Sequence, residues 1–556
     1  MSLFSGLSIG SRALHASQMG LHVTGENISN ANTEGYSRKR LALVAESRKD
    51  GAFGQVGFGV DVRFIERVRN AFVDKQLVEQ LATHGYKEMV NYGFERIENI
   101  HQEPSENGIA QVMEDFWDAW SDVANNPSDK SSRETLKSTT IVMTERFHYT
   151  AQEMRNYKLS INDEIEAKTK QLNNLAKQIS DLNYKVVNSE SIHSQNANDS
   201  RDLRDTLLKE LADMVSISYV EDSTGAVTVT TGGNMLVSPQ RAFELETVRH
   251  TLVEPDGFRF TYNGLRFVGT HEPFVPQNGE LKALFDIRDE IIPSFEKELD
   301  VLVTGIVREV NEAHAKGYTI DHLTGVEFFD SSKTSAITMS LSAAIMESSN
   351  NIAAAQGGNV VTPMDATLAM DSDNTLTLTN VDLKYRDIVE GSVKVVDTAT
   401  GYELLLGADK DYVIDHELGR VRILNPAYAA GHSFTVSFQY NDRGFSGEGD
   451  GNNALNISLL RSAKTMNEKV NGSYANNFNE FYAGYIGRLG VERNQAKLEL
   501  ETQHYLVAQL SNQQESISGV NLDEEIASLI KYQHTFQASA RFLTTIGDML
   551  DVLMRM

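Results

Sequence analysis

The chain has 556 residues, 40% of them hydrophobic and 23% charged, and is long enough for several domains. Its formal net charge of −26 argues against binding to nucleic acid or to anionic membrane surfaces, which both favour positive charge. The absence of cysteine excludes disulfides, thiol nucleophiles and cysteine-ligated zinc. No stretch approaches the roughly 18 apolar residues of a membrane-spanning helix, and the start lacks the pattern of a signal peptide.

Residues 1–32 are predicted to form a helix with a coiled-coil seam. Asn30, Asn32 and Gly35 then end it, because Asn and Gly tolerate the left-handed conformation of a helix C-terminus. Spacings of four and three residues alternate along the helix without a break, and small side chains in one row allow a neighbouring helix to approach closely. One heptad position holds Leu7, Leu14, Leu21 and Ile28, and the other holds Leu3, Gly10, Ser17, Thr24 and Ala31.

Strands and long helices follow this first helix. Residues 36–70 alternate in polarity and contain glycines at 51, 54, 57 and 59, so we expect short strands or an extended hairpin. Helix is predicted from about 70 to 122, and "NNPSD" at 125–129 breaks it. A second long helix follows, in which apolar residues from Ile161 to Val186 keep the same alternation of four and three, with Lys168 the one exception.

The middle of the chain alternates between strand and helix patterns. From about 216 the apolar period changes to two, which predicts hairpins, and helix resumes from Gly279 to about Lys316. A second β-rich block at 358–445 has the pattern of an antiparallel sandwich. From about 453 we expect helix to the end, with a last seam that includes Leu522, Ile526, Leu529, Phe536, Leu543 and Leu550.

These elements predict a multidomain α+β fold, in which both termini build a long helical coiled coil or bundle and β-rich outer domains are inserted. Four domains are expected. They are a terminal coiled-coil inner domain (1–60 with 510–556), a helical bundle domain (61–215 with 279–357 and 446–509), a β-rich domain (216–278) and an inserted sandwich-like outer domain (358–445).

Nothing in the sequence singles out a catalytic residue, a cofactor or a metal. "GEGDGNN" at 447–453 lacks the last glycine of a dinucleotide loop, and "DSDNT" at 371–375 lacks the turn glycine and distal glutamate of a calcium loop. His15 and His22 stand seven apart without a third ligand nearby. The acid pairs Glu524–Glu525 and Asp286–Asp289 are most simply solvated faces, although a glycosidase-type pair among 77 acids stays open.

Two terminal motifs carry a resemblance to a known family. "NISNANTEGYSR" at 27–38 resembles the signature near the start of flagellar rod, hook and hook-associated axial proteins, with Glu34 in the family's proline position. "SGVNLDEE" at 518–525 and "YQ…FQASAR" at 532–541 resemble the hook-associated members that form the first hook–filament junction. Internal stretches agree with this, namely "ANNPSD" with Arg133, "NDSRDLRDTLLKEL", "GELKALFDIRDEIIPSFEKELDVL", "VNEAHAKGY" and "GDGNNAL".

The resemblance implies a structural, extracellular component of the bacterial flagellum and not an enzyme. Such proteins are exported by the flagellar type III apparatus, self-associate into a ring, and contact the hook protein and a second junction protein on the filament side. The resemblance also implies an export chaperone that binds the C-terminal helix. No nucleic acid, membrane insertion, metal or cofactor is expected.

We expect the assembly contacts on the terminal helices and on the turn after the first one. Neighbouring subunits would cover apolar faces that the two ends cannot cover themselves. Two alternatives stay open: another axial protein, such as a hook or distal junction component, and a surface adhesin or hydrolase acting through 358–445. The predicted assembly residues are Leu3, Leu7, Leu14, Leu21, Ile28, Asn30, Asn32, Gly35, Tyr36, Leu522, Ile526, Leu529, Phe536, Leu543 and Leu550.

Overall fold

The structure is a computed structural model, and its described residues form two compact units. Unit 1 comprises Met1–Gly93, Leu159–Arg288 and Arg493–Met556, and unit 2 comprises Phe94–Lys158 and Asp289–Glu492. The glycines at 51 and 54 and parts of the 358–445 block lie outside the described residues. The described residues are 3–47, 57–193, 196–254, 257–356, 360–377, 388–389, 391–407, 410–415, 420–442, 449–468 and 474–555.

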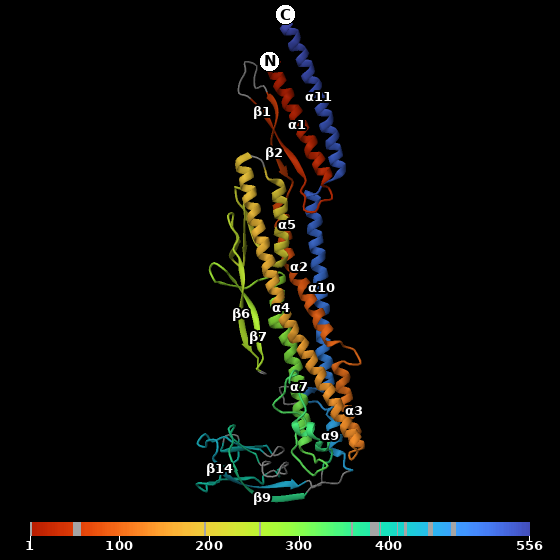
Figure 1. Ribbon diagram of the computed structural model, residues 1–556, viewed down its shortest axis with the longest axis vertical. Coiled ribbons are helices and arrows are strands. Elements are labelled where there is room, and N and C mark those ends of the chain that lie inside the picture. The colour runs from red at the N-terminus through yellow and green to blue at the C-terminus, as the bar shows by residue number, and fades with distance from the viewer. Residues whose placement is uncertain are drawn as a thin grey trace. The chain divides into compact units, whose positions relative to one another are not determined.

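The two ends of the chain meet in unit 1. Helix α1 (Leu3–Ser29) packs along helix α11 (Leu522–Arg555), as Figure 1 shows. The antiparallel hairpin of β1 (Lys39–Ser47) and β2 (Gly57–Arg67) also packs against α1. Three other long helices, α2 (Ala71–His101), α4 (Lys130–His193) and α10 (Phe478–Ser518), contribute residues to both units.

The middle of unit 1 combines one further helix pair with two small sheets. Helix α5 (Asn198–Met214) contacts α6 (Glu280–Asp286). Two antiparallel three-stranded sheets have the orders β3-β4-β5 and β6-β7-β8. Their strands are β3 (Ser218–Glu221), β4 (Val227–Thr231), β5 (Asn234–Val237), β6 (Leu245–Val253), β7 (Arg259–Phe267) and β8 (Pro273–Phe274).

Unit 2 is built around an aromatic core. Helix α3 (Ile109–Asn125) packs on α9 (Asn452–Leu459), which also contacts α7 (Ile292–Ala315). A short helix, α8 (Ala343–Glu347), follows α7 along the chain. The core rings are fully buried and meet edge-on or tilted, an arrangement that aromatic pairs prefer; they are Phe116, Trp117, Trp120, Phe328 and Phe329.

The 358–445 block contains two antiparallel three-stranded sheets, with orders β10-β13-β12 and β11-β14-β9. Residues of both sheets contribute to one cluster of buried side chains, which includes Leu376, Val421, Val395 and Phe434. This is the arrangement of a small two-layered sandwich. Its strands are β9 (Val360–Ala369), β10 (Thr375–Thr377), β11 (Lys394–Asp397), β12 (Tyr412–Asp415), β13 (Arg420–Ile423) and β14 (Ser433–Asp442).

The predicted fold class is confirmed, since long helices occupy both ends of the chain and small antiparallel sheets lie in the middle. Within the described part of the chain, no helix combines the length and the apolar character needed to cross a membrane.

Three predicted helices are interrupted. The helix expected over 70–122 is two helices, α2 and α3, because Pro104 and Gly108 lie between them. The helix expected from Gly279 to Lys316 contains a π-helical turn, Ile287–Ile291, just before Pro293 in the first turn of α7. Proline has no N–H with which to continue the regular hydrogen-bond ladder.

The region after 453 is also not a single helix. A short antiparallel hairpin of β15 (Met466–Glu468) and β16 (Tyr474–Asn476) separates α9 from α10. Asn467 has a φ of 57°, a left-handed conformation that a right-handed helix cannot contain. The helical prediction was therefore wrong for residues 460–468 and 474–477.

Unit 2 contains a buried histidine that should make its stability depend on pH. The ring nitrogens of His101 lie 2.8 Å from the Ile97 carbonyl oxygen and 2.5 Å from the Tyr485 hydroxyl. Burial lowers the pKa of His101 to about 4, whereas the pKa of a histidine in an unfolded chain is about 6.5. The fold therefore favours the neutral ring, so this stabilisation is complete above pH ~6.5 and is lost as the pH falls toward 4.

We expect the stability advantage of the wild type over His101→Gln to shrink by about 3 kcal/mol between about pH 7 and pH 4, because the variant has no ring to protonate. Denaturant unfolding of both proteins across this range measures the difference. His322→Asn, which changes an exposed histidine at a left-handed position where Asn is tolerated, should follow the wild-type profile. A pH dependence that is unchanged in His101→Gln would refute the assignment.

Candidate assembly interface

Helices α1 and α11 approach each other through a stripe of glycines on α1. A Cβ atom on Gly20 would lie 2.5 Å from the Tyr532 ring, and one on Gly6 would lie 2.8 Å from Cδ1 of Ile546. A Cβ on Gly10 would likewise come within 2.8 Å of Leu543. Such distances are shorter than real Cβ contacts, so a larger residue at these positions would force the opposing side chains to shift. The residue order shows that the two helices are antiparallel.

The leucine row of the predicted seam is less buried than the glycine stripe. Leu7 is 39% exposed, and Leu14, Leu21 and Ile28 are only partly buried. The fully buried positions on α1 are instead small or medium-sized residues: Gly10, Ala16, Ser17, Gly20, Val23, Thr24 and Asn27. The side chain of Leu3 lies outside the described residues. In the single chain, the leucine row therefore presents apolar surface that remains accessible.

The C-terminal helix divides its apolar residues in a similar way. Leu529, Phe536, Leu543 and Leu550 are partly buried. Leu522 is exposed, and Ile526 is 49% exposed. The buried residues of α11 are Glu525, Ser539 and Ile546, and Glu525 stands one position before Ile526 of the predicted seam. That part of the predicted register is shifted by one residue relative to the α1 contact.

Asn27 organises the turn after α1. Its Nδ2 donates to the Lys39 carbonyl oxygen at 2.9 Å and to Oε2 of Glu525 at 3.1 Å. Its Oδ1 accepts from the Lys39 backbone N–H at 3.0 Å and from the Tyr36 hydroxyl at 2.8 Å. All four hydrogen-bonding positions of this buried amide are thus satisfied. The side chain joins α1, the start of β1 and the first turn of α11.

Arg38 makes a second connection between the two terminal motifs. Its Nε donates to Oε1 of Glu525 and its Nη1 to Oε2 of Glu524, both at 2.7 Å. Its backbone N–H donates to the Ser518 carbonyl oxygen at 2.8 Å. Glu525 is only 3% exposed, so the expectation that Glu524–Glu525 forms a solvated face was wrong for Glu525. A buried carboxylate needs such partners, because desolvation otherwise disfavours its charge. We call Asn27, Tyr36, Arg38, Lys39 and Glu525 the turn cluster.

The turn is also fixed to α5. Ser37 donates from its backbone N–H and from its hydroxyl to the two carboxylate oxygens of Asp202, at 3.1 and 2.6 Å. Gly35 has a φ of 78°, and a Cβ there would lie 2.5 Å from the Thr206 hydroxyl. Arg67 of β2 pairs with Asp202 and Asp205, both at 2.7 Å. The motif "NDSRDLRDTLLKEL" thus provides the acids that hold this turn.

The remaining predicted turn residues differ in their roles. Asn30 donates from Nδ2 to the Glu26 carbonyl oxygen at 3.0 Å, whereas Asn32 is exposed. Burial, with the negative charges of Glu26 and Asp202, raises the pKa of the Tyr36 hydroxyl, so it stays protonated as a hydrogen-bond donor. Sequence reasoning missed Asn27 and Glu525 as structural contacts. The signal was available, because both stand inside the quoted terminal motifs.

The quoted motifs of unit 2 are likewise buried polar contacts. Arg133 donates from Nε to the Pro127 carbonyl oxygen and from Nη1 to that of Ile352, both at 2.6 Å. His314 accepts from the Ala353 backbone N–H at 2.8 Å. Asn453 donates to the Ala353 carbonyl oxygen at 2.7 Å. These side chains satisfy backbone groups that would otherwise be buried without partners, which is a role in folding.

The acid pair Asp286–Asp289 was expected to be solvated, and this was wrong for Asp286. Asp286 is buried and accepts from the Tyr86 hydroxyl at 3.0 Å. His15 and His22 are both exposed on α1. Neither belongs to a group of three potential metal ligands within the described ranges.

Two family models of flagellar proteins match parts of this chain. The family model for the flagellar hook-associated protein FlgK helical domain matches residues 94–329. The model for the flagellar basal body rod FlgEFG protein C-terminal region matches residues 513–556. The second match covers Ser518, Glu524 and Glu525, which contact Arg38.

Curated relatives match over nearly the whole chain. The flagellar hook-associated protein 1 of Bacillus subtilis is 24% identical over 588 residues, covering 99% of this chain and 97% of the relative. That of Salmonella typhimurium is 27% identical over 559 residues, covering 97% and 98%. Among solved structures, the flagellar hook junction protein FlgK from Burkholderia pseudomallei matches with a TM-score of 0.56 at 18% identity, covering 80% of this chain and all of that one. This last likeness concerns the fold.

The glycine stripe predicts a specific sensitivity to added methyl groups. Gly20→Ala should destabilise the α1–α11 pair by about 1–3 kcal/mol, because the new Cβ would overlap the Tyr532 ring. Hydrogen exchange of α1 and α11 amides measures the change. Gly25→Ala is the matched control, since no atom lies within 4 Å of its Cβ position and Ala favours helix by about 1 kcal/mol. Equal protection in both variants would contradict the packing.

The buried carboxylate of the turn cluster gives a second prediction. Glu525→Gln should lower the free energy of unfolding by about 1–3 kcal/mol, because it removes the charge that pairs with Arg38 and presents an amide to the donors of Asn27 and Arg38. Chemical denaturation followed by circular dichroism measures the loss. Glu524→Gln removes the exposed partner of the same arginine and should cost less than about 1 kcal/mol. A larger loss for Glu524→Gln would contradict the role given to Glu525.

Proposed function

Because the chain belongs to the family of flagellar hook-associated proteins, we propose that its paired terminal helices assemble it into the hook–filament junction of the bacterial flagellum. It is a structural and extracellular component of the flagellum, and it associates with other flagellar axial proteins. The observation that carries the proposal is the apolar surface left on α1 and α11 after they have paired with each other.

The accessible surface is divided between the two helices. On α1 it contains the partly buried leucine row with Leu7 at its exposed end. On α11 it contains large apolar side chains from the first turn to the last: Leu522, Ile526, Ile530, Phe542, Met549, Val552, Leu553 and Met554. An isolated apolar residue on a surface is ordinary, but many large apolar side chains exposed on one helix mark a protein–protein contact.

The turn cluster supports the same proposal, because it fixes α1 and α11 as a rigid pair. A pre-organised pair loses less conformational entropy on association than two free helices would. We therefore propose that subunits form a ring in which pairs pack side by side. The predicted interface then includes Leu3, Leu7, Leu14, Leu21 and Ile28, together with the exposed residues of α11.

The further partners follow from the same arrangement. In this proposal the ring contacts the hook protein on one side and a second junction protein on the filament side. An export chaperone covers the exposed apolar residues of α11 before export through the flagellar type III apparatus. In the proposed assembly, residues 1–60 and 510–556 form the inner domain and the β-rich blocks face outward. The protein acts by assembly and carries no enzymatic activity.

Replacing Leu14 and Leu21 together by Asp should abolish incorporation into the flagellum, because two carboxylates would be buried between subunits without partners. The measurement is the amount of the protein in isolated hook–basal bodies from cells whose only copy carries the change. Circular dichroism of the purified variant should show an unchanged helix content, since both side chains are only partly buried in the single chain.

The matched control is His15→Asp with His22→Asp, which adds two carboxylates on exposed positions of the same helix. It should assemble at wild-type level. Normal incorporation of the leucine double variant would show that this row is not the interface. Loss of assembly in both double variants would show that any negative charge on α1 interferes, and the specific role of the leucines would be refuted.

A further inference from the structure

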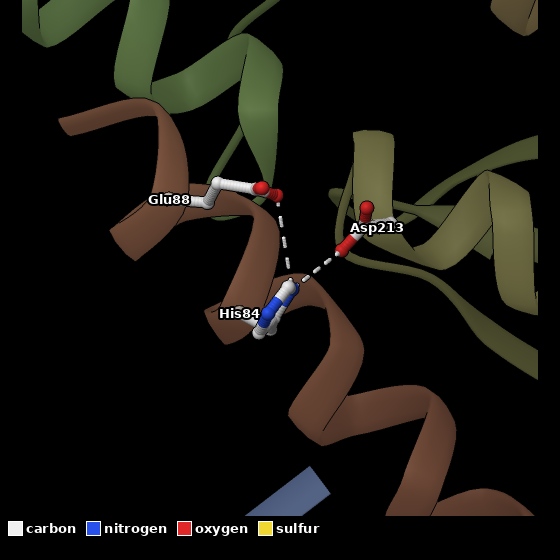
Figure 2. A group of neighbouring side chains, drawn as sticks. All are labelled: His84, Glu88 and Asp213. Atoms are coloured by element: carbon white, nitrogen blue, oxygen red, sulfur yellow. Dashed lines mark hydrogen bonds and ion pairs between the residues drawn. The ribbon is translucent and has the colours of Figure 1, made fainter. Parts of the chain in front are cut away.

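Three acidic and imidazole side chains gather in unit 1, away from the terminal helices. Figure 2 shows His84 and Glu88 on α2 facing Asp213 in the last turn of α5. Nδ1 of His84 lies 3.4 Å from Oδ1 of Asp213 and 4.0 Å from Oε2 of Glu88. One ligand atom from each residue lies within 4.8 Å of the others. Within the described ranges, this is the one group of three or more such side chains with that spacing.

We propose that His84, Glu88 and Asp213 form a binding site for a divalent transition-metal ion of the Zn²⁺ class. Zn²⁺ binds imidazole nitrogen and carboxylate oxygen at about 2.0–2.2 Å, so neighbouring ligand atoms around a tetrahedral ion stand about 3.3–3.6 Å apart. The His84–Asp213 distance already meets this value. Glu88 must move closer to His84 and Asp213, which its exposed side chain allows.

The backbone brings the two helices together at this point. Gly85 follows His84, and a Cβ at Gly85 would collide with the backbone carbonyl oxygen of Asp213. The glycine therefore lets α2 approach the C-terminal end of α5. His84 and Glu88 are four residues apart, so they share one face of α2. The position of the three ligands thus depends on helix packing and not on a mobile loop.

The electrostatic surroundings also suit a cation. The charges that act on His84 are those of Asp213 and Glu88, both negative. The C-terminal end of α5 adds the negative end of its helix dipole. Two carboxylates and a neutral imidazole carry a charge of −2, which a divalent ion neutralises. With no cysteine in the chain, the available ligands are nitrogen and oxygen, and imidazole favours Zn²⁺ and its neighbours over Mg²⁺ or Ca²⁺.

His504 is a candidate for a fourth ligand, because it lies next to His84. The ring of His504, on α10, has its centroid 5.9 Å from that of His84, and His504 is exposed. A rotation of its side chain would bring an imidazole nitrogen toward the site, and otherwise water completes the coordination. The ion would then connect α2, α5 and α10, which are separated by more than a hundred residues in sequence.

The test is isothermal titration calorimetry, which measures the heat released or absorbed when ZnCl₂ is added to the metal-free full-length protein. We expect one binding event that Mg²⁺ at the same concentration does not reproduce. His84→Gln and Asp213→Asn should each weaken Zn²⁺ affinity at least about 10-fold, and Zn²⁺ should raise the melting temperature of the wild type but not of these variants. His15→Gln, which removes an exposed histidine on α1, should bind as the wild type does.

Three outcomes would overturn the proposal. They are the absence of binding heat, binding that is unchanged in both variants, and equal binding of Mg²⁺. The second would mean that others of the 14 histidines bind Zn²⁺ adventitiously, and that His84 and Asp213 form only an ion pair. Should Asp213→Asn fail to fold, Glu88→Gln alters the most exposed ligand and must still weaken the binding.

Discussion

The buried carboxylate of Glu525 is the contact on which the arrangement of the two ends depends. It accepts hydrogen bonds from Asn27 and Arg38, which stand almost five hundred residues earlier in the chain. Desolvating a carboxylate is costly, so the site is stable only when both partners are in place. The first turn of α11 is therefore held against the turn that ends α1. The antiparallel pairing of the two helices follows from the hydrogen bonds of Glu525 and from the glycine stripe on α1.

The pairing explains why the terminal helices carry more apolar residues than one partner can cover. Glycines on α1 allow the close approach of α11, and the leucines of α1 stay only partly buried. In a protein that acts alone, such a row would be a liability for aggregation. In the assembly proposed above, it is the surface that neighbouring subunits cover. In this proposal the same helices hold a subunit together and join it to the next.

The polar residues of the quoted motifs form hydrogen bonds that stabilise this fold. Asn27 satisfies its amide completely, Ser37 and Asp202 fix the turn to α5, and Arg133 and His314 pair with backbone groups in unit 2. Polar residues of this kind invite a catalytic interpretation when only the sequence is seen. Their partners, mostly backbone atoms or oppositely charged side chains, instead account for them as elements of folding. The cluster of His84, Glu88 and Asp213 differs, because it joins one imidazole to two acids and remains open to solvent.

The sequence by itself determined the long helices at both ends, the β-rich blocks between them and the family signatures, because heptad spacing, alternation and turn residues are local signals. It did not determine where α2 and α3 separate, or that a hairpin stands between α9 and α10, because short breaks interrupt a periodic pattern only weakly. Only the tertiary structure decided which face of α1 meets α11, that Glu525 is buried, and that His84 and Glu88 lie beside Asp213. The physical reason is that these outcomes depend on the distance between helix backbones, which glycines such as Gly20 and Gly85 set and which no spacing along the chain records.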